Sequence, residues 1–452
     1  MRSAESTQGV ELSDLIYLTS FGDVFRALRP AFSKRSWPFA VMVAVAWTLS
    51  VGRRTVTAFI RQTDGKRHWT LWYKFFSVYR WSELAIAHIL VGMAQEIFGL
   101  TRLVLVADDT LTGKTGPLIF GCGWFADHSA KPLRFLWGQN WVILGLSVYI
   151  QEWKRWVCFP LITRPYLRRK NCPKDWAFRT RLTLVEEMVQ DVLGGLSESV
   201  RKLGIILVAD GAYAKNQLLK AFQELSIPVV SRLRSDATLY EEPVEPKGKR
   251  AGRKRRWGPR MDKLSKIVEA GGFSKLVVSM YGKEVTLWVK SFVALWKPAG
   301  GAIRVVITKS PAQPDGRRLI GFFFTTDLTL RLLEVISLVS ARWPIEQAIR
   351  DGKQLMGFGD AQVRLRPSVL RLTNLGLQLQ SLIGLWFFHF HRGSKPATVA
   401  PWYPQKSACC FADMLALLRR EMMNVRISAV LGRLAMRPRI LRAVMKVLGK
   451  AA

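Results

Sequence analysis

Two apolar runs, each closed by an aspartate, constrain the fold of this chain more than any other feature. Residues 102–110 read Arg-Leu-Val-Leu-Val-Ala-Asp-Asp-Thr, and residues 204–213 read Gly-Ile-Ile-Leu-Val-Ala-Asp-Gly-Ala-Tyr. A run that is apolar at every position is typical of a strand buried on both faces of a sheet. Open sheets carry their sites at the carboxyl ends of such strands. Asp108 and Asp210 are therefore candidate site residues, with Asp109 as the alternative to Asp108.

A third acid lies in a segment that is predicted to be helical. Residues 342–353 read Arg-Trp-Pro-Ile-Glu-Gln-Ala-Ile-Arg-Asp-Gly-Lys, and Pro344 suits the first position of a helix, where its missing N–H costs nothing. Glu346 then falls in the first turn. At helical spacing Glu346, Arg350 and Lys353 share one face, with Arg342 just ahead of it. On spacing alone, an exposed stripe of ion pairs is an equal alternative to a functional site.

The rest of the chain is predicted to alternate strands and helices, which makes the fold class α/β. The expected elements outside the three motifs are strands at 141–150 and 227–233 and helices at 180–193, 214–225 and 330–341. Residues 276–307 alternate apolar and polar side chains as antiparallel strands do, and we interpret them as an insertion within the same domain. Residues 16–95 and the chain after Glu346 are predicted to be helical.

Charge points to a polyanionic partner. Lys and Arg number 68 against 33 Asp and Glu, which gives a net charge of +35. Nucleic acid is the first candidate for such a chain and an anionic membrane surface the second. The basic segment 247–260 carries eight cations and no acid. The cations expected to contact DNA are Arg342, Arg350, Lys353, Arg53, Arg54, Lys249, Arg250, Arg253, Lys254, Arg255 and Arg256.

Arg53 and Arg54 belong to a glycine turn between two short helices. Residues 50–61 read Ser-Val-Gly-Arg-Arg-Thr-Val-Thr-Ala-Phe-Ile-Arg. This is the pattern of a helix-turn-helix, whose second helix can lie in a DNA groove. A helical hairpin that only packs in a bundle is an equally good interpretation. We expect residues 52–61 and 247–260 to contact DNA.

Cysteine and hydropathy patterns indicate the compartment. The five Cys form no Cys-x-x-Cys pair and only five His are present, so no zinc site is predicted. Unpaired Cys fit a reducing cytosol. The N-terminus lacks a signal-peptide pattern. The apolar stretches 38–51 and 372–390 are too short or too interrupted to span a bilayer, and we expect both to be buried helices.

Three acids in a strongly basic chain need a chemical reason, because carboxylates repel DNA phosphates. Divalent cations supply one, since Mg²⁺ takes oxygen ligands and bridges carboxylates to phosphate oxygens. Two such ions about 4 Å apart can activate a water or a 3′-hydroxyl and stabilise the leaving oxygen. We therefore predict that Asp108, Asp210 and Glu346 are catalytic and bind two Mg²⁺ or Mn²⁺ ions, with Arg342 and Lys353 on phosphates. An aspartate that only caps a helix or forms a turn is the structural alternative at each strand end.

These residues resemble the motifs of the DDE transposases of bacterial cut-and-paste insertion sequences. The signature of that family around its third acid is Tyr-x2-Arg-x3-Glu-x6-Lys, and this chain has Arg342, Glu346 and Lys353 at that spacing, with Val339 in place of the tyrosine. Val-Ala-Asp-Asp-Thr at 106–110 is similar to the first-acid motif and favours Asp108. Asp210-Gly-Ala-Tyr is similar to the second-acid motif.

The resemblance implies an RNase H-like mixed sheet with a β-strand insertion at about 230–318. The expected domains are a helical DNA-binding region at 1–95, a catalytic domain at 96–393 and a helical basic region at 394–452. In some relatives a flipped base stacks on a tryptophan of the insertion, where Trp257, Trp288 and Trp296 lie here; burial in the core is the more common role of such residues.

The implied activity is metal-dependent cleavage at transposon ends and joining of the 3′-hydroxyls to target DNA. The partners would be double-stranded DNA and a second copy of the chain, as a homodimer on DNA. The location would be the bacterial cytoplasm, at the nucleoid, with no membrane. The alternatives are an RNase H-like nuclease without strand transfer and a degenerate transposase that only binds DNA; a membrane-surface protein would leave the three acids unexplained.

Overall fold

A computed structural model describes residues 12–63, 67–127, 130–243, 255–280, 282–313, 315–396 and 404–431. Its helices are α1 Leu12–Tyr17, α2 Phe21–Arg26, α3 Trp37–Leu49, α4 Val56–Arg61, α5 Thr70–Ser77, α6 Glu83–Phe98, α7 Arg181–Gly194, α8 Glu198–Arg201, α9 Asn216–Glu224, α10 Leu264–Glu269, α11 Leu332–Ser340, α12 Trp343–Leu355, α13 Arg366–Phe390 and α14 Phe411–Leu431. Its strands are β1 Arg102–Gly113, β2 Gly123–Asp127, β3 Arg134–Ile150, β4 Arg155–Tyr166, β5 Gly204–Ala209, β6 Val229–Arg232, β7 Ser274–Met280, β8 Lys283–Trp296, β9 Gly301–Lys309 and β10 Ile320–Thr325.

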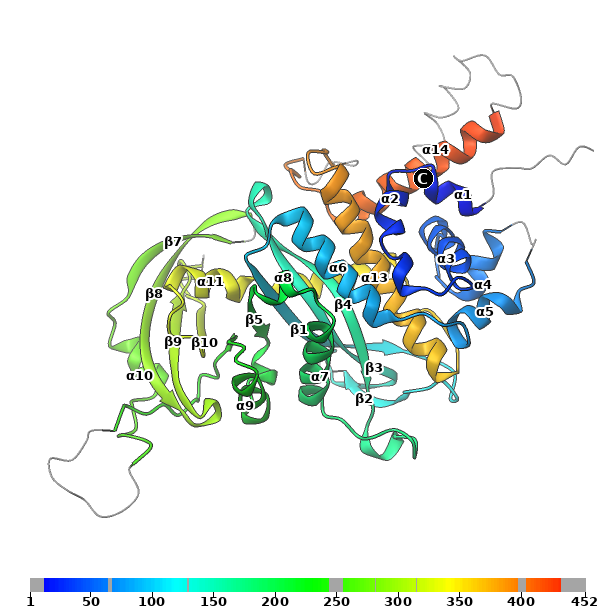
Figure 1. The fold of residues 1–452 in the computed structure, drawn as a ribbon. Coiled ribbons are helices and arrows are strands. Elements are labelled where there is room, and N and C mark those ends of the chain that lie inside the picture. Colours follow the sequence, from blue (N-terminus) through cyan, green and yellow to red (C-terminus); the bar gives the residue numbers. More distant parts are fainter. Residues whose placement is uncertain are drawn as a thin grey trace, which may run out of the picture.

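The described strands form one mixed sheet in the order β2-β3-β1-β5-β6-β10-β9-β8-β7, with β4 paired to β3. Strand β1 is antiparallel to β3 and parallel to β5, and β5 is parallel to β6. This arrangement is the RNase H-like core that the sequence predicted. Figure 1 shows the core sheet between the N-terminal helices on one side and strands β7–β10 on the other.

The insertion extends the core sheet and is not a separate layer. Strand β10 returns from the insertion to pair antiparallel with β6, and β9, β8 and β7 follow outward in antiparallel order. The predicted antiparallel strands at 276–307 are thus confirmed. Part of the basic segment that precedes them, at 244–254, lies outside the described residues, and with it the predicted DNA contacts Lys249, Arg250, Arg253 and Lys254.

Helices α3 and α13 are the two apolar stretches that were predicted to be buried. Every residue of α3 from Phe39 to Leu49 is buried, and α13 is buried from Asn374 to Phe388. Burial of α3 over whole turns places it in the interior of the core. No described helix is long and apolar enough to cross a membrane.

The polar residues that interrupt α13 have a structural role at the outer edge of β4. The amide of Asn374 accepts from the backbone N–H of Thr163 and donates to its carbonyl, at 2.8 and 3.1 Å. Gln378 and Ser381 donate to the carbonyls of Leu161 and Pro160. Because an open strand edge leaves backbone groups unpaired, these side chains take the place of a neighbouring strand.

Candidate active site

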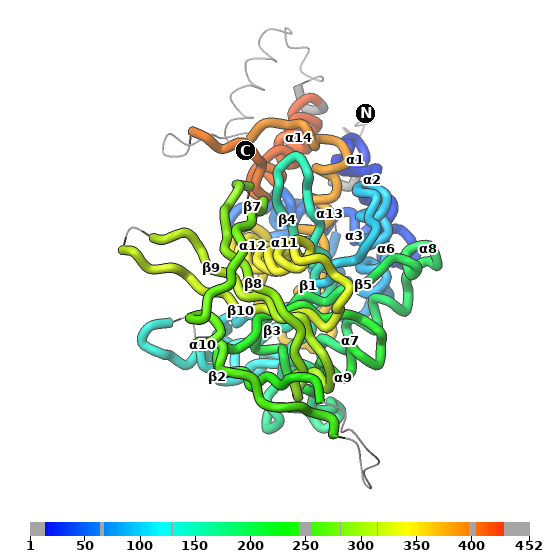
Figure 2. The backbone as a smooth tube through the Cα atoms, turned by 90° about the vertical axis from the view of Figure 1, so that its left-hand side faces the viewer, coloured from blue at the N-terminus to red at the C-terminus, as the bar shows by residue number. Residues whose placement is uncertain are grey.

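The two faces of the central sheet separate the neighbouring aspartates of β1. Val104 and Val106 belong to the apolar cluster that includes Ile345 and Ile349 of α12, whereas Leu103, Leu105 and Ala107 belong to the cluster on the opposite face. Since side chains alternate along a strand, Asp108 continues the α12 face and Asp109 the opposite one. Figure 2 shows α11 and α12 in front of the strands on that face.

The second aspartate follows the strand that pairs with β1. Strands β1 and β5 run parallel in register, with Ala107 opposite Ala209, so Asp108 and Asp210 are the next residues on neighbouring strands. Neighbouring strands lie about 4.8 Å apart, which keeps the two residues close. Ile206 and Val208 of β5 face the same cluster as Val106, so the alternation places Asp210 on the α12 face as well.

Helix α12 brings Glu346 to this point, and an arginine joins the acids. The helix begins at Trp343, one residue before the predicted start, with Arg342 as its N-cap. The Arg342 guanidinium donates to Asp108 Oδ2 at 3.2 Å and to Glu346 Oε1 at 2.5 Å. Burial acts to lower the pKa of Arg342, but the hydrogen bond to Glu346 and the charges of Glu346, Asp108 and Asp210 raise it overall. The structure therefore brings all three predicted acids around one cationic group.

The surroundings of Asp108 destabilise the ionised form of its carboxyl group. Its side chain is 19% exposed. Burial raises the pKa of Asp108 to about 6, against the opposing effects of the Asp109 backbone N–H and the Arg342 guanidinium. A carboxylate that loses hydration in this way is stabilised when a cation binds it.

Asp109 has a different set of partners on the far face of the sheet. Its carboxylate accepts from the Tyr213 hydroxyl and from Asn140 Nδ2, each at 3.1 Å, and lies 3.4 Å from Arg181 Nε. Tyr213 is 2% exposed and follows Asp210 by one turn of 3-10 helix. These contacts tie the loop that carries Asp210 to β1. They favour Asp108 over Asp109 as the member of the acidic cluster.

The predicted phosphate contacts on α12 are engaged within the protein. Lys353 Nζ donates to Thr110 Oγ1 at 2.7 Å and to the Leu111 carbonyl at 2.8 Å, so it fixes α12 to the continuation of β1. Arg342 is held by Asp108 and Glu346. Arg350 is 59% exposed and lies 3.9 Å from Asp351, so it is the α12 cation most open to a ligand. The ion-paired face of α12 and the candidate site therefore share Arg342 and Glu346.

The other predicted DNA contacts differ in exposure. Arg54 is only 4% exposed, and its backbone N–H donates to Asp360 Oδ2. Its pKa is lowered to about 10 by burial and by Arg419. Arg53 is exposed and donates to the Asp360 carbonyl. Arg255 and Arg256 are exposed, and Arg256 donates to the Gly300 carbonyl. The buried Arg54 is therefore a structural residue here, because its turn packs against the loop after α12.

The insertion tryptophans are divided between core and surface. Trp296 is 7% exposed and packs against Phe324, as expected of a core residue. Trp288 and Trp257 are half-buried, beneath the guanidinium groups of Arg318 and Arg256.

No described group of three or more His, Cys, Asp or Glu side chains is arranged to hold a metal ion. At the three acids, the Arg342 guanidinium donates to both Asp108 and Glu346. Both carboxylates are oxygen donors that converge on one positive charge, and this is the donor type that Mg²⁺ and Mn²⁺ take. The residues therefore fit a divalent ion, provided that the guanidinium moves aside.

A mixed sheet with this order and with acids at two neighbouring strand ends and on the helix that covers them defines an RNase H-like enzyme of phosphodiester chemistry. The family model described as DDE superfamily endonuclease matches residues 27–272, and the one described as Transposase DDE domain matches residues 186–372. The first covers more than half of the chain, and the chain belongs to the DDE superfamily. The two matched segments together contain Asp108, Asp210 and Glu346.

The family membership confirms the predicted resemblance to DDE transposases, and it makes the chain a nuclease-type enzyme of a superfamily that uses divalent metal ions. The narrower signature around the third acid stays a prediction. No curated protein matches the chain.

Proposed function

We propose that the chain is a DNA transposase that cleaves transposon ends and joins their 3′-hydroxyls to target DNA, with Asp108, Asp210 and Glu346 as the catalytic acids. The observation that supports this most is the convergence of the Asp108 and Glu346 carboxylates on a single guanidinium beside Asp210. An ordinary surface ion pair would not connect the end of a central strand to the first turn of the helix that covers the same face of the sheet.

Each acid has a distinct supporting element. Strand β1 fixes Asp108 in the sheet, the Tyr213–Asp109 hydrogen bond fixes the loop of Asp210, and the Lys353 contacts fix α12 and hence Glu346. The divalent ions, when bound, activate the attacking hydroxyl and stabilise the leaving oxygen. With ions on the carboxylates, Arg342 would no longer be held by Asp108 and Glu346, and it could bind a DNA phosphate, the role that the sequence predicted.

The partners and the location of the protein belong to the same proposal. The partners are double-stranded transposon ends and target DNA, the protein acts as a homodimer on DNA, and its place is the nucleoid of the bacterial cytoplasm. The domain boundaries near 95 and 393 and the DNA contacts of residues 52–61 and 247–260 also stay predictions. A nuclease without strand transfer would use the same acids, so the assay must follow joining as well as cleavage.

The test is the substitution Glu346→Gln, which keeps the shape of the side chain and removes its charge. A neutral amide is a poor ligand for Mg²⁺, so cleavage and joining of an end-containing duplex should fall by at least about 100-fold. Binding in a gel-shift titration at fixed salt should persist, because phosphate affinity comes from Lys and Arg. The matched control is Glu198→Gln, since the Glu198 side chain is 84% exposed on α8.

Wild-type cleavage by Glu346→Gln would refute the assignment of Glu346. Loss of binding together with cleavage would show that Glu346 is structural. If cleavage is lost in Glu346→Gln and wild type cleaves without joining, the nuclease alternative holds.

A further inference from the structure

A groove of about 630 Å³ lies between the N-terminal helices and the loop that follows α12. Its lining comes from the α3–α4 turn, from α4 and α5, and from residues 361–363 of that loop. The side chains that matter for its chemistry are Arg53, Thr57, Arg61, Tyr73 and Gln362. The N-terminal helical part and the catalytic part of the chain therefore build it jointly.

The groove has the charge and the donors of a site for a phosphodiester backbone. Arg53 and Arg61 are both exposed, and none of the described residues that line the groove is Asp or Glu. Tyr73 is 37% exposed, and its hydroxyl lies 3.4 Å from Thr57 Oγ1. Arginines with neutral hydroxyl and amide donors are the groups that contact DNA phosphates. The net charge of +35 favours the same class of ligand.

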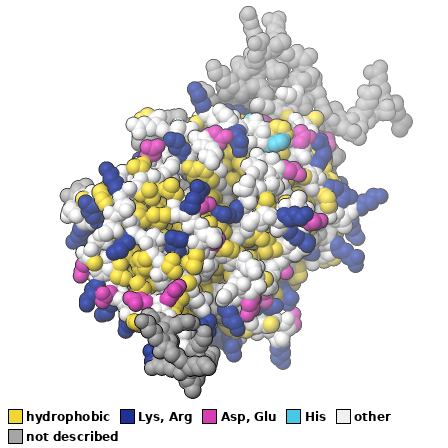
Figure 3. Space-filling model, turned by 60° about the vertical axis from the view of Figure 1, so that its left-hand side comes forward, with side chains coloured by type: hydrophobic (Ala, Val, Ile, Leu, Met, Phe, Trp, Pro, Cys, Tyr) yellow, Lys and Arg dark blue, Asp and Glu magenta, His cyan; other side chains and the backbone are white. Residues whose placement is uncertain are grey.

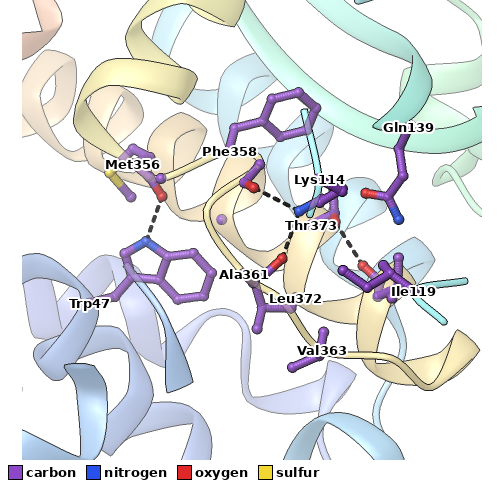
Figure 4. Close-up of a pocket in the computed structure, with 14 residues that line it drawn as sticks. Trp47, Lys114, Ile119, Gln139, Met356, Phe358, Ala361, Val363, Leu372 and Thr373 are labelled. Atoms are coloured by element: carbon purple, nitrogen blue, oxygen red, sulfur yellow. Dashed lines mark hydrogen bonds between the residues drawn. The ribbon is translucent and has the colours of Figure 1, made fainter. Parts of the chain in front are cut away.

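Several hydrogen bonds hold this groove against the end of the catalytic helix. Arg54 N–H donates to Asp360 Oδ2 at 2.9 Å, and Trp47 Nε1 donates to the Met356 carbonyl at 2.9 Å. Lys114, just past the end of β1, donates to the carbonyls of Gly359 and Ala361. Figure 4 shows Trp47 and Lys114 reaching the loop from different elements. The groove is therefore in a fixed position relative to both β1 and α12.

Two independent measures give the distance from the acids to the loop that borders the groove. Along α12, nine residues separate Glu346 from Leu355, which is about 14 Å at 1.5 Å per residue. Along β1, Thr112 lies four residues after Asp108, which is also about 14 Å at 3.4 Å per residue. Gly359 of the loop lies against Thr112, since a Cβ on Gly359 would meet its side chain at 3.0 Å. The loop lies at that distance, and the groove lies just beyond it, at roughly 15–20 Å.

We propose that this groove binds the sugar-phosphate backbone of the DNA that the active site cuts, about four to six base pairs from the cleaved phosphate. This inference rests on the proposed function and adds the position and chemistry of a binding site to it. The spacing follows because B-DNA rises about 3.4 Å per base pair.

The first experiment measures binding without turnover. Fluorescence anisotropy with a short random-sequence duplex in EDTA gives the dependence of log K on log salt for wild type and for Arg53→Ala/Arg61→Ala. Removal of two phosphate contacts should make the slope shallower by about 1.8, and Arg53→Lys/Arg61→Lys should restore most of it. The control is Arg26→Ala/Arg201→Ala, which removes the same charge outside the groove lining.

The second experiment locates the contact. A duplex in which the cleavage position has been mapped carries a single neutral methylphosphonate at each phosphate in turn. Wild type should lose affinity several-fold when the substitution falls four to six base pairs from the cleaved bond. The arginine-to-alanine double variant should show no such position.

The outcomes separate this proposal from the catalytic one, because the first experiment needs no cleavage. An unchanged salt slope in the folded double variant overturns the groove as a DNA site. A changed monomer–dimer equilibrium with an unchanged slope would instead make it a protein interface, which also overturns the proposal. If wild type loses affinity when a different phosphate is neutralised, and the double variant loses affinity at that same phosphate, the contact lies elsewhere on the protein.

Discussion

Asp108 makes the stability of the protein depend on pH in a definite direction. The folded state holds its proton up to about pH 6, whereas the unfolded chain releases it near 3.8, so unfolding releases a proton between these values. The unfolding free energy that Asp108 contributes therefore falls as pH rises through this window, by about 2–3 kcal/mol.

The substitution Asp108→Asn should remove this dependence. Urea unfolding in EDTA from pH 4 to pH 7 should show wild type losing stability relative to the variant as pH rises. Addition of Mg²⁺ at pH 7 should stabilise wild type and leave the variant nearly unaffected, since the ion binds the ionised carboxylate. Parallel pH profiles for the two proteins would contradict the role of burial at Asp108.

Tyr213 is expected to act on the metal site through Asp109 without binding the metal. Tyr213→Phe removes the hydroxyl that donates to Asp109 and leaves the ring in the core. Groups that orient the ligands of a metal typically change metal affinity by about 10- to 100-fold, so the Mn²⁺ concentration for half-maximal cleavage should rise at least several-fold. Cleavage at saturating Mn²⁺ should recover. Tyr17→Phe, far from the site on α1, is the control, and an equal Mn²⁺ midpoint in all three proteins would argue against the positioning role.

The sequence could predict the three acids but not their relation to Arg342. The alternation along β1 does distinguish Asp108 from Asp109, once α12 is known to cover the Val104 and Val106 face. That knowledge requires the packing of α12, which no local pattern contains. For the same reason, sequence reasoning missed the network of Asp109, Tyr213, Asn140 and Arg181, although the Asp-x-x-Tyr spacing at 210–213 is visible in the sequence.

At the scale of elements, one lysine adds hydrogen bonds to the apolar packing that holds α12 on β1. Lys353→Ala removes the donors to Thr110 Oγ1 and to the Leu111 carbonyl. We expect a loss of about 1 kcal/mol in unfolding free energy and a lower cleavage rate, because Glu346 is carried by the same helix. Thr110→Val removes one of the two acceptors and should have a smaller effect of the same kind.

The salt dependence of DNA binding separates this role from a phosphate contact. An anchoring lysine leaves the slope of log K against log salt unchanged in Lys353→Ala. A slope shallower by about 0.9 with unaltered stability would show that Lys353 leaves β1 to bind phosphate.

Most central elements can be predicted because their patterns are local. Strands β1, β5 and β6 and helices α7, α9 and α11 lie at the expected residues, within a few positions at their ends, whereas β3 begins seven residues before the predicted start at 141. The short β2 and the edge strand β4 were missed. On its outer edge, β4 takes backbone partners from Asn374, Gln378 and Ser381 of α13. In the sequence those polar positions are only breaks in an apolar run.

At the scale of the whole molecule, excess positive charge should dominate binding to any duplex. Lys and Arg side chains spread over the visible face of the molecule (Figure 3). The basic segment 247–260, of which residues 255–260 are described, adds eight cations. Replacement of all eight by Ser should make the salt slope shallower by about 0.9 for each phosphate that the segment neutralises in wild type, while the cleavage position stays the same. An unchanged slope would exclude that segment from DNA binding.

The single continuous sheet also has a consequence for how the chain is made. The strands that carry Asp108 and Asp210 can pair early in synthesis. Strand β10, which pairs with β6, and α12 with its N-cap Arg342 and with Glu346 follow the whole insertion. Such distant pairings form late and slowly. A nascent chain that stops before residue 342 would therefore hold two of the acids without their counter-ion or their third partner. On the proposed function, cutting would require Glu346, so it could begin only after the ribosome has delivered α12.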